Sequence, residues 1–427
     1  MMRKTFHLIL FLLCFSGEIF AQTLSLEQIL ATSLNDERVT RDAQMEQFTN
    51  NLNFNLPPVK KIELRLGLNG NNTSDTLDGN LRNEDYYSLN LTTNKLKEMK
   101  LQKQIKPAQV NLFNKEKEMF QMQAIQDRYT VLTSLYYNTE ALKKKKELQD
   151  LLNKKNELLQ NLLNEGITIK INDALDTEKD LVLVFNMIQE EENAITINKA
   201  KLCQFFSTSK ELFVDFKGMI TPKKIIANNI LLKQDSINQH PSVIYKEAQY
   251  QLAAANNILE RAQNTNVLNS FQVGYNRPVY TSEILKKFKP ENTLTFRVGI
   301  SIPIMGNYNF NRNNSNIQQY NALLNWQTSQ VIQDKTINVQ ESRFENSIRQ
   351  YNALIDIYSK SIISRLLENE KVVAQSTALE LIDMRIAKKK IEINMLLSAG
   401  TLTQNYIQLL ENKGLLNYST RSQYLLE

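Results

Sequence analysis

The chain has 427 residues, of which 42% are hydrophobic and 22% are charged, and its formal net charge is +6. This balance excludes an intrinsically disordered chain, which carries too few apolar residues, and a bundle of transmembrane helices, which carries too few charges. The chain has only two His and two Cys, which leaves little room for zinc sites, His-based catalytic triads or disulfide frameworks. The composition therefore argues against an enzyme.

The first 21 residues have the pattern of a secretory signal peptide. Arg3 and Lys4 supply a positive start, residues 8–15 an apolar core, and Ala21 a cleavage site. The apolar core is shorter than the roughly 20 residues of a membrane-spanning helix. We therefore expect an exported mature chain, and its small positive charge does not favour nucleic acid as a partner.

Two tracts of the sequence permit long helices. No proline lies between residues 108 and 221, and none lies after residue 303. Apolar residues in these tracts alternate between spacings of three and four, as in Phe344, Ile348, Tyr351 and Ile355. This 3.5-residue repeat is typical of a coiled-coil seam, so each tract predicts a long antiparallel helix hairpin.

Each tract also contains a glycine at which the helix is expected to reverse. Residues 161–168 around Gly166 are similar to residues 395–402 around Gly400, and a shorter helix follows each. The similarity predicts two repeats. The first covers residues 22–220, with a helix, a β-hairpin at about 61–93 and a helix hairpin at about 97–206. The second covers 221–427, with a helix, a β-hairpin at about 270–304 and a helix hairpin at about 308–427. Because the second descending helix is over 20 residues longer than the first, its turn could instead lie near residues 388–394.

Two pairs of segments alternate strictly between apolar and polar residues, the pattern of strands with two different faces. One pair centres on Leu64 and Leu89, and the other on Val273 and Phe296. Such strands usually cover a soluble core, but the helices are committed to their own seams. The segments have roughly 9–11 residues, enough to cross a bilayer when tilted. Four strands cannot close in lipid, so two copies would give eight strands and three copies 12. A lumen continuous with long helices favours three.

If lipid covers the apolar faces, the polar faces line a lumen. An arginine that faces lipid costs about 2–4 kcal/mol at the bilayer midplane, so Arg65 and Arg297 are expected to face the lumen and to set its charge. The expected lumen-facing residues are Glu63, Arg65, Asn90, Gln272, Asn276 and Arg297.

The order of these elements resembles that of the outer-membrane efflux protein family, the TolC-like duct proteins. Residues 24–30 (LSLEQIL), 240–243 (HPSV) and 301–304 (SIPI) resemble the family's motifs, and Gly166 and Gly400 match its hairpin-tip glycines. The resemblance implies a homotrimer with a 12-stranded barrel in outer-membrane lipid and a helical tunnel in the periplasm. It also implies a periplasmic adaptor protein and an inner-membrane transporter as partners, with no cofactor, metal or catalytic residue. The implied function is passive conduction within a tripartite efflux or type I secretion system.

The resemblance also implies an entrance near the hairpin tips. Family members often place carboxylates just past the second tip glycine, but residues 401–406 contain none. A polar constriction by Gln404, Asn405 and Tyr406 is the substitute hypothesis. Asp173 and Asp176 are further candidates, although helix-start carboxylates are also favoured by the macrodipole alone.

Two other classes stay open. A trimeric surface adhesin would carry its four strands together at the C-terminus, whereas residues 405–427 have a helical pattern. A structural coiled-coil protein of the envelope would lack two-faced strands of membrane length. No nucleophile–base pair, metal cluster or phosphate-binding loop supports an enzyme. The sequence identifies neither the transported substrate nor the pump.

Overall fold

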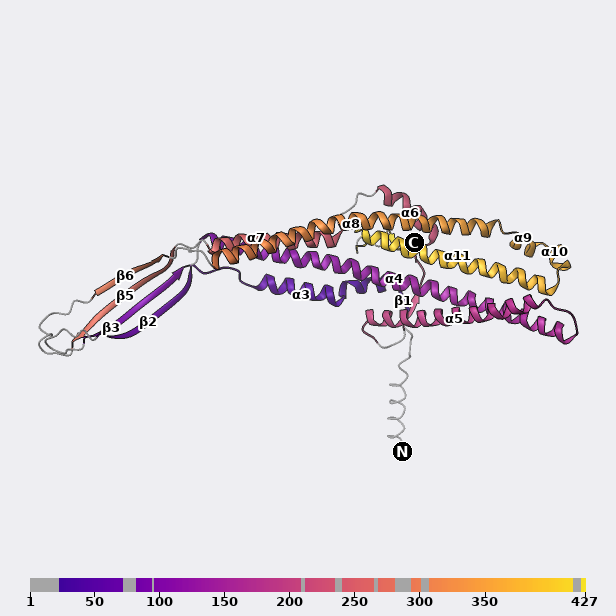
Figure 1. The fold of residues 1–427 in the computed structure, drawn as a ribbon, viewed down its shortest axis with the longest axis horizontal. Helices are drawn as coiled ribbons and strands as arrows, with labels where there is room; N and C mark the ends of the chain where they lie inside the picture. The colour runs from indigo at the N-terminus through magenta and orange to yellow at the C-terminus, as the bar shows by residue number, and fades with distance from the viewer. Residues whose placement is uncertain are drawn as a thin grey trace, which may run out of the picture. The chain divides into compact units, whose positions relative to one another are not determined.

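A computed structural model describes residues 23–71, 82–93, 96–208, 212–234, 240–264, 268–280, 293–300, 307–417 and 424–427 (Figure 1). The predicted signal peptide and the motif at residues 301–304 lie outside these residues. Among the described residues, no helix is both long enough and apolar enough to cross a membrane.

Helices make up most of the described chain, and two of them are long. The helices are α2 (Leu26–Ala31), the 3-10 helix η1 (Thr32–Asn35), α3 (Glu37–Asn51), α4 (Leu96–Asn164), α5 (Ile171–Phe205), α6 (Pro222–Gln234), α7 (Pro241–Asn264), α8 (Asn307–Ser359), α9 (Ile362–Glu368), α10 (Glu370–Gln375) and α11 (Ala378–Asn412). The strands are β1 (Thr23–Ser25), β2 (Val59–Asn71), β3 (Arg82–Thr93), β4 (Phe213–Asp215), β5 (Leu268–Tyr280) and β6 (Thr293–Ile300).

The chain forms two compact units, and each unit takes segments from both halves of the sequence. The sheet unit comprises Arg41–Lys117 and Ser242–Val331. The helical unit comprises Met1–Thr40, Glu118–Pro241 and Ile332–Glu427. The units therefore do not coincide with the two sequence repeats, because each unit combines segments from both halves of the sequence.

The sheet unit contains a four-stranded antiparallel sheet in the order β2-β3-β5-β6. Its central pair, β3 and β5, joins the first half of the sequence to the second. In the same unit α7 packs on α8, where Tyr250 stacks on Trp326 with ring centroids 5.7 Å apart. Trp326 is thus a packing residue, as expected for a long helix. Among the described strands, β2 and β6 are the edges of this sheet.

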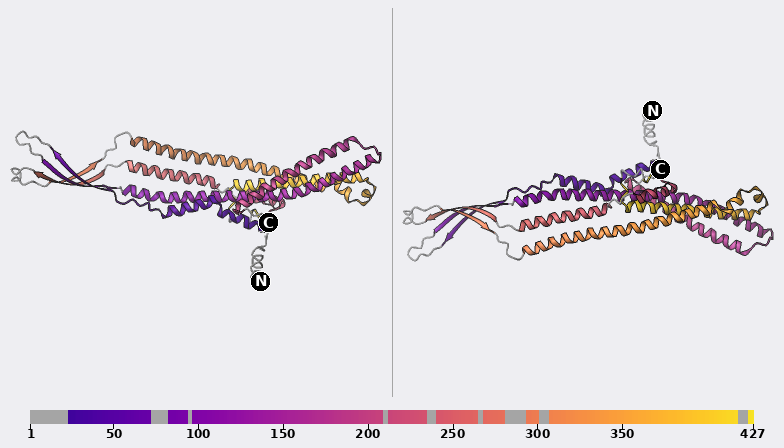
Figure 2. Two further views of the ribbon diagram at one scale, coloured as in Figure 1. Left: turned by 90° about the horizontal axis from the view of Figure 1, so that it is seen from below. Right: turned by 90° about the horizontal axis from the view of Figure 1, so that it is seen from above.

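In the helical unit, α5 turns back along α4 and α11 lies beside α4 (Figure 2). The core contains apolar side chains from all three helices, including Leu152, Val184, Ile188, Ile386 and Ile393. A second cluster, centred on Tyr129, Phe344, Leu402, Tyr406 and Leu410, joins α4, α8 and α11. The coiled-coil periodicity of the sequence therefore corresponds to helix packing within one chain.

The second helix hairpin does not turn where the sequence analysis placed it. Gly400 lies inside α11, and residues 388–394 do as well, so both predicted turns are wrong. The helix instead breaks between Ser359 and Ala378, with α9 and α10 as short pieces. The side chain of Thr377 accepts a hydrogen bond from the Glu380 backbone, and Glu380 accepts one from the Thr377 backbone. This capping box starts α11 without any glycine.

The C-terminal part of the chain is also less helical than its pattern indicates. Helix α11 ends at Asn412, and Gly414 has a φ of +68°, which terminates the helix. Leu426 then forms an antiparallel bridge with Met219, and the hydroxyl of Tyr129 donates to the carbonyl of Leu425 over 2.5 Å. Residues 424–427 are therefore held against the core of the helical unit.

Candidate functional site

One face of the sheet carries apolar residues that no described part of the sheet unit covers. Leu64 is 67% exposed and Phe296 is 63% exposed. The strand register aligns the apolar residues in three rows that cross all four strands: Ile62–Leu91–Phe271–Val298, Leu64–Leu89–Val273–Phe296 and Leu66–Tyr87–Tyr275–Leu294. A continuous, exposed apolar surface of this kind marks a site of interaction with lipid or protein.

The opposite positions of the same strands bring the predicted lumen residues together. Glu63, Asn90, Gln272 and Arg297 occupy one row across the four strands. Arg65 lies in the next row, two residues along β2, and its guanidinium lies 3.1 Å from the Glu63 carboxylate. These positions share one face because strand side chains alternate with a period of two.

Asn276 occupies the same parity of β5, four residues from Gln272, in register with Thr293 of β6. The six predicted lumen residues therefore lie on the polar side of a single sheet. That this side of the sheet lines a lumen stays a prediction.

The first helix hairpin reverses at Gly166, as predicted. Gly166 has a φ of +76°, a conformation that costs little only for glycine. Its N–H donates to Leu163 O over 3.1 Å, and Ile167 N–H donates to Leu162 O over 2.9 Å. These two bonds form a Schellman motif, which ends α4. The turn is compact.

Apolar side chains are exposed around this turn. Leu163 is 60% exposed, and Ile167 and Ile171 are also exposed. Asp173 and Asp176 follow in the first turns of α5, where the Asp176 side chain is 72% exposed and its Oδ1 lies 3.9 Å from Lys179 Nζ. Their location fits both earlier interpretations, an entrance or a helix start.

The three residues predicted to form a constriction, Gln404, Asn405 and Tyr406, differ in how deeply they are buried. Tyr406 is fully buried, and its hydroxyl donates to Tyr424 O over 3.0 Å and accepts from Asn228 Nδ2 over 2.9 Å. Burial raises the pKa of Tyr406 above its usual value. The prediction that Tyr406 constricts an entrance is therefore wrong, because the residue faces the core and a helical pattern alone does not distinguish the two faces.

Gln404, in contrast, is exposed and borders a cavity of about 550 Å³ in the helical unit. Its lining is rich in side-chain amides: Gln126, Gln204, Gln404 and Gln408. Asn405 is half-buried, and its carbonyl accepts from Gln340 Nε2 over 3.1 Å. Of the proposed amide pair, only Gln404 reaches an open surface.

Lysine residues of α4 and α11 form ion pairs between helices. Lys144–Glu392, Lys389–Glu147 and Lys155–Asp383 join α4 to α11, Lys145–Glu191 joins α4 to α5, and Lys390–Asp180 joins α5 to α11. Burial works to raise the pKa of Glu392, but the ammonium groups of Lys389 and Lys144 outweigh it and hold the pKa below its usual value. These pairs fix the relative positions of three helices.

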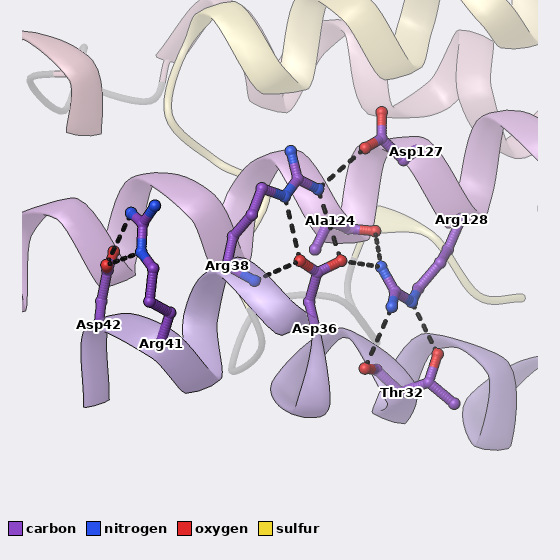
Figure 3. Close-up of polar contacts among 8 residues, drawn as sticks. All are labelled: Thr32, Asp36, Arg38, Arg41, Asp42, Ala124, Asp127 and Arg128. Carbon is purple, nitrogen blue, oxygen red and sulfur yellow. Dashed lines mark hydrogen bonds and ion pairs between the residues drawn. The ribbon is translucent and has the colours of Figure 1, made fainter. Parts of the chain in front are cut away.

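A buried arginine that the sequence analysis did not single out anchors the N-terminal helices (Figure 3). Arg128 donates from Nε to Thr32 Oγ1 over 2.7 Å and from Nη1 to Asp36 Oδ2 over 3.2 Å, and it lies over the Phe205 ring at 4.6 Å. Burial favours protonation of Asp36, yet the hydrogen bonds from Arg38 and Arg128 lower its pKa overall. The cluster is internally satisfied, so it positions helices and offers no open binding group.

Helix α8 exposes a second apolar surface within the sheet unit. Phe310, Ile317, Leu324 and Val331 recur every seven residues, and all four are exposed. A heptad seam of this kind packs against another helix in coiled coils. In the described part of the chain no group of His, Cys, Asp or Glu side chains could hold a metal ion.

Two long helix hairpins combined with two β-hairpins in one antiparallel sheet define the fold of the TolC-like outer-membrane channels. No family model matches the sequence, and no curated protein matches it. Solved structures of this class do match over nearly the whole chain, so the resemblance predicted from the sequence is confirmed at the level of the fold.

The chain is similar to CusC with a TM-score of 0.60 and 13% identity, over 90% of this chain and 91% of that one. It is similar to the open state of the Neisseria gonorrhoeae MtrE outer membrane channel with a TM-score of 0.59 and 14% identity, over 91% and 89%. For the outer membrane protein VceC from Vibrio cholerae the TM-score is 0.58 and the identity 9%, over 90% and 95%.

Proposed function

We propose that this protein is the outer-membrane channel component of an efflux or type I secretion system, through which solutes pass passively to the exterior. The observation that carries the proposal is the two-faced sheet, with three exposed apolar rows on one side and charged and amide residues on the other. Strands β2, β3 and β5 have 13, 12 and 13 residues, enough to cross a bilayer when tilted.

The same sheet supports assembly from several copies. Lipid does not tolerate the open edges of β2 and β6, because unpaired backbone groups cost several kcal/mol each there. Three copies of a four-stranded sheet give a closed ring of 12 strands, whereas eight strands leave an interior that side chains fill. The exposed heptad seam of α8 offers a second surface on which neighbouring copies pack. The proposed assembly is therefore a homotrimer.

The proposed orientation places the sheet in the outer membrane and the helices in the periplasm. A periplasmic adaptor and an inner-membrane transporter would dock at the helix hairpins. The apolar residues around Gly166 support this, because Leu163, Ile167 and Ile171 are exposed and offer an apolar surface to a partner. In this arrangement Asp173 and Asp176 remain the candidates that line the entrance, whereas Gln404 lies within α11 beside Ser134 of α4, away from the turn at Gly166.

The decisive experiment measures the detergent-corrected molar mass of the protein extracted from purified outer membranes. A value near three chains, together with ion conductance after reconstitution into planar bilayers, supports the channel. A trimer without conductance favours a surface adhesin. A monomer, or recovery only in the soluble periplasm, contradicts the proposal, because four strands would then have to remain open in lipid.

A further inference from the structure

The polar face of the sheet carries an excess of positive charge. Among the positions of this parity whose side chains the structure describes, three hold basic residues, Lys61, Arg65 and Arg297, and one holds an acidic residue, Glu63. The excess is therefore two positive charges per chain. The acidic residue lies on β2, whereas Arg297 lies on β6.

The contacts on β2 show how this charge is distributed. Glu63 pairs with both Lys61 and Arg65, and the two cations remain largely accessible, at 63% and 64%. One carboxylate between two cations leaves the group positive. Arg65 and Lys61 thus present their charge to the polar side even while they contact Glu63.

Arg297 contributes a separate charge. It is exposed, and none of the ion pairs found among the described residues includes it. Three strand spacings of about 4.8 Å separate β6 from β2, so Glu63 of the same chain lies farther away than the Debye length of about 8 Å at physiological ionic strength. Glu63 of the same sheet therefore screens Arg297 weakly.

Closure of the ring does not alter the total. Whichever register β6 adopts with β2 of the next copy, each chain adds the same residues to the polar face. Rings of basic side chains make pores prefer anions, because they attract anions and repel cations at close range.

We propose that the polar face of the sheet makes this channel anion-selective, with Arg65 and Arg297 as the residues that determine the selectivity. The inference rests on the proposed channel function and adds a substrate class to it, namely solutes that carry net negative charge. The apolar rows on the other face exclude the alternative in which these arginines serve a lipid-facing surface.

The test is the reversal potential of the trimer in planar bilayers under a KCl gradient. The wild-type channel should favour chloride over potassium. The double substitution R65Q/R297Q should lower the chloride-to-potassium permeability ratio by about two- to fivefold, the Coulomb effect of these charges across a water-filled lumen. The change should be larger at low salt, where screening is weaker.

Two matched variants make the test specific. Glu63→Gln removes a negative charge from the same row, so it should raise the permeability ratio. R65K/R297K keeps the charges and should restore the wild-type ratio if charge, rather than side-chain shape, sets selectivity. Channels that favour potassium, or whose ratio is the same in R65Q/R297Q and the wild type, overturn the inference and leave the channel function intact. A folded trimer that never conducts overturns both.

Discussion

The two units of this protein differ in how deeply their central apolar side chains are buried. In the helical unit, residues such as Leu132 and Tyr129 are fully buried by other helices of the same chain. In the sheet unit, residues of the same kind, such as Leu64 and Phe296, are mostly exposed. The helical unit thus builds an apolar core from its own helices, although it also exposes residues such as Ile171 and Phe185, whereas the apolar rows of the sheet stay exposed in the single chain. The difference separates apolar side chains that one copy of the chain buries from apolar side chains that it leaves for another surface to cover.

The largest expected effect comes from the helical core. Leu132→Ala should lower the free energy of unfolding by about 2–5 kcal/mol, because it leaves a cavity among fully buried side chains. The measurement is denaturant unfolding of the detergent-solubilised protein, followed by circular dichroism. Leu163→Ala, at an exposed position of the same helix, should change the value by no more than about 0.5 kcal/mol. Equal losses in both variants would mean that the two positions are buried alike.

The effect of a new arginine on the stability of the sheet should depend on the face that carries it. Phe296→Arg places a charge on the apolar face and should cost about 2–4 kcal/mol in a bilayer. Thr295→Arg, at the adjacent position on the polar face, should be nearly neutral. The measurement is the unfolding free energy in lipid vesicles, compared between the two variants. If both arginines are tolerated equally, lipid does not cover the apolar rows.

The smallest expected effect concerns pH and the ion pairs between helices. Lys389 and Lys144 lower the pKa of Glu392 below its usual value of 4.5. A carboxylate with a lowered pKa stabilises the fold above its unfolded pKa, and this contribution is lost as the pH falls through the folded pKa. The wild type should therefore exceed Glu392→Gln in stability at neutral pH by up to about 1 kcal/mol.

This advantage should disappear as the pH falls below 4.5. The measurement is the thermal midpoint of both proteins across acidic pH. Glu165→Gln, at an exposed position of the turn, is the matched control for the loss of a carboxylate outside the ion pairs. A constant difference between Glu392→Gln and the wild type at all pH values would contradict the ion-pair account.

The sheet was more predictable from sequence than the helix hairpins. Alternation in a strand assigns each residue to one of two faces, so the sequence alone predicts that Glu63, Gln272 and Arg297 share a face. Burial in a helix is less certain, because several faces can be covered by different partners. The family resemblance predicts Tyr406 at an entrance because it follows Gly400, and its contacts with Asn228 and Tyr424 cannot be inferred from spacing.

The second hairpin shows that a glycine in a helical pattern does not by itself predict a turn. Gly166 has a positive φ, but Gly400 lies inside a helix. Tyr137 packs against Gly400, and a Cβ atom at this position would lie 3.3 Å from Tyr137 Cγ. The signal for the true start of α11 was present as Thr377 followed three residues later by Glu380, a capping-box pattern. Arg128 had no such signal, since its partners Thr32 and Asp36 are distant in sequence.

The pairing of β3 with β5 also determines the order in which the chain can fold. Each β-hairpin, β2–β3 and β5–β6, joins strands that are close in sequence, but Leu89 meets Val273 across the whole first helix hairpin. Closing so long a loop costs entropy that only later contacts offset, and such pairings form slowly. Two separate half-sheets therefore precede the complete sheet. At this stage the exposed edges of the half-sheets make the chain prone to aggregation.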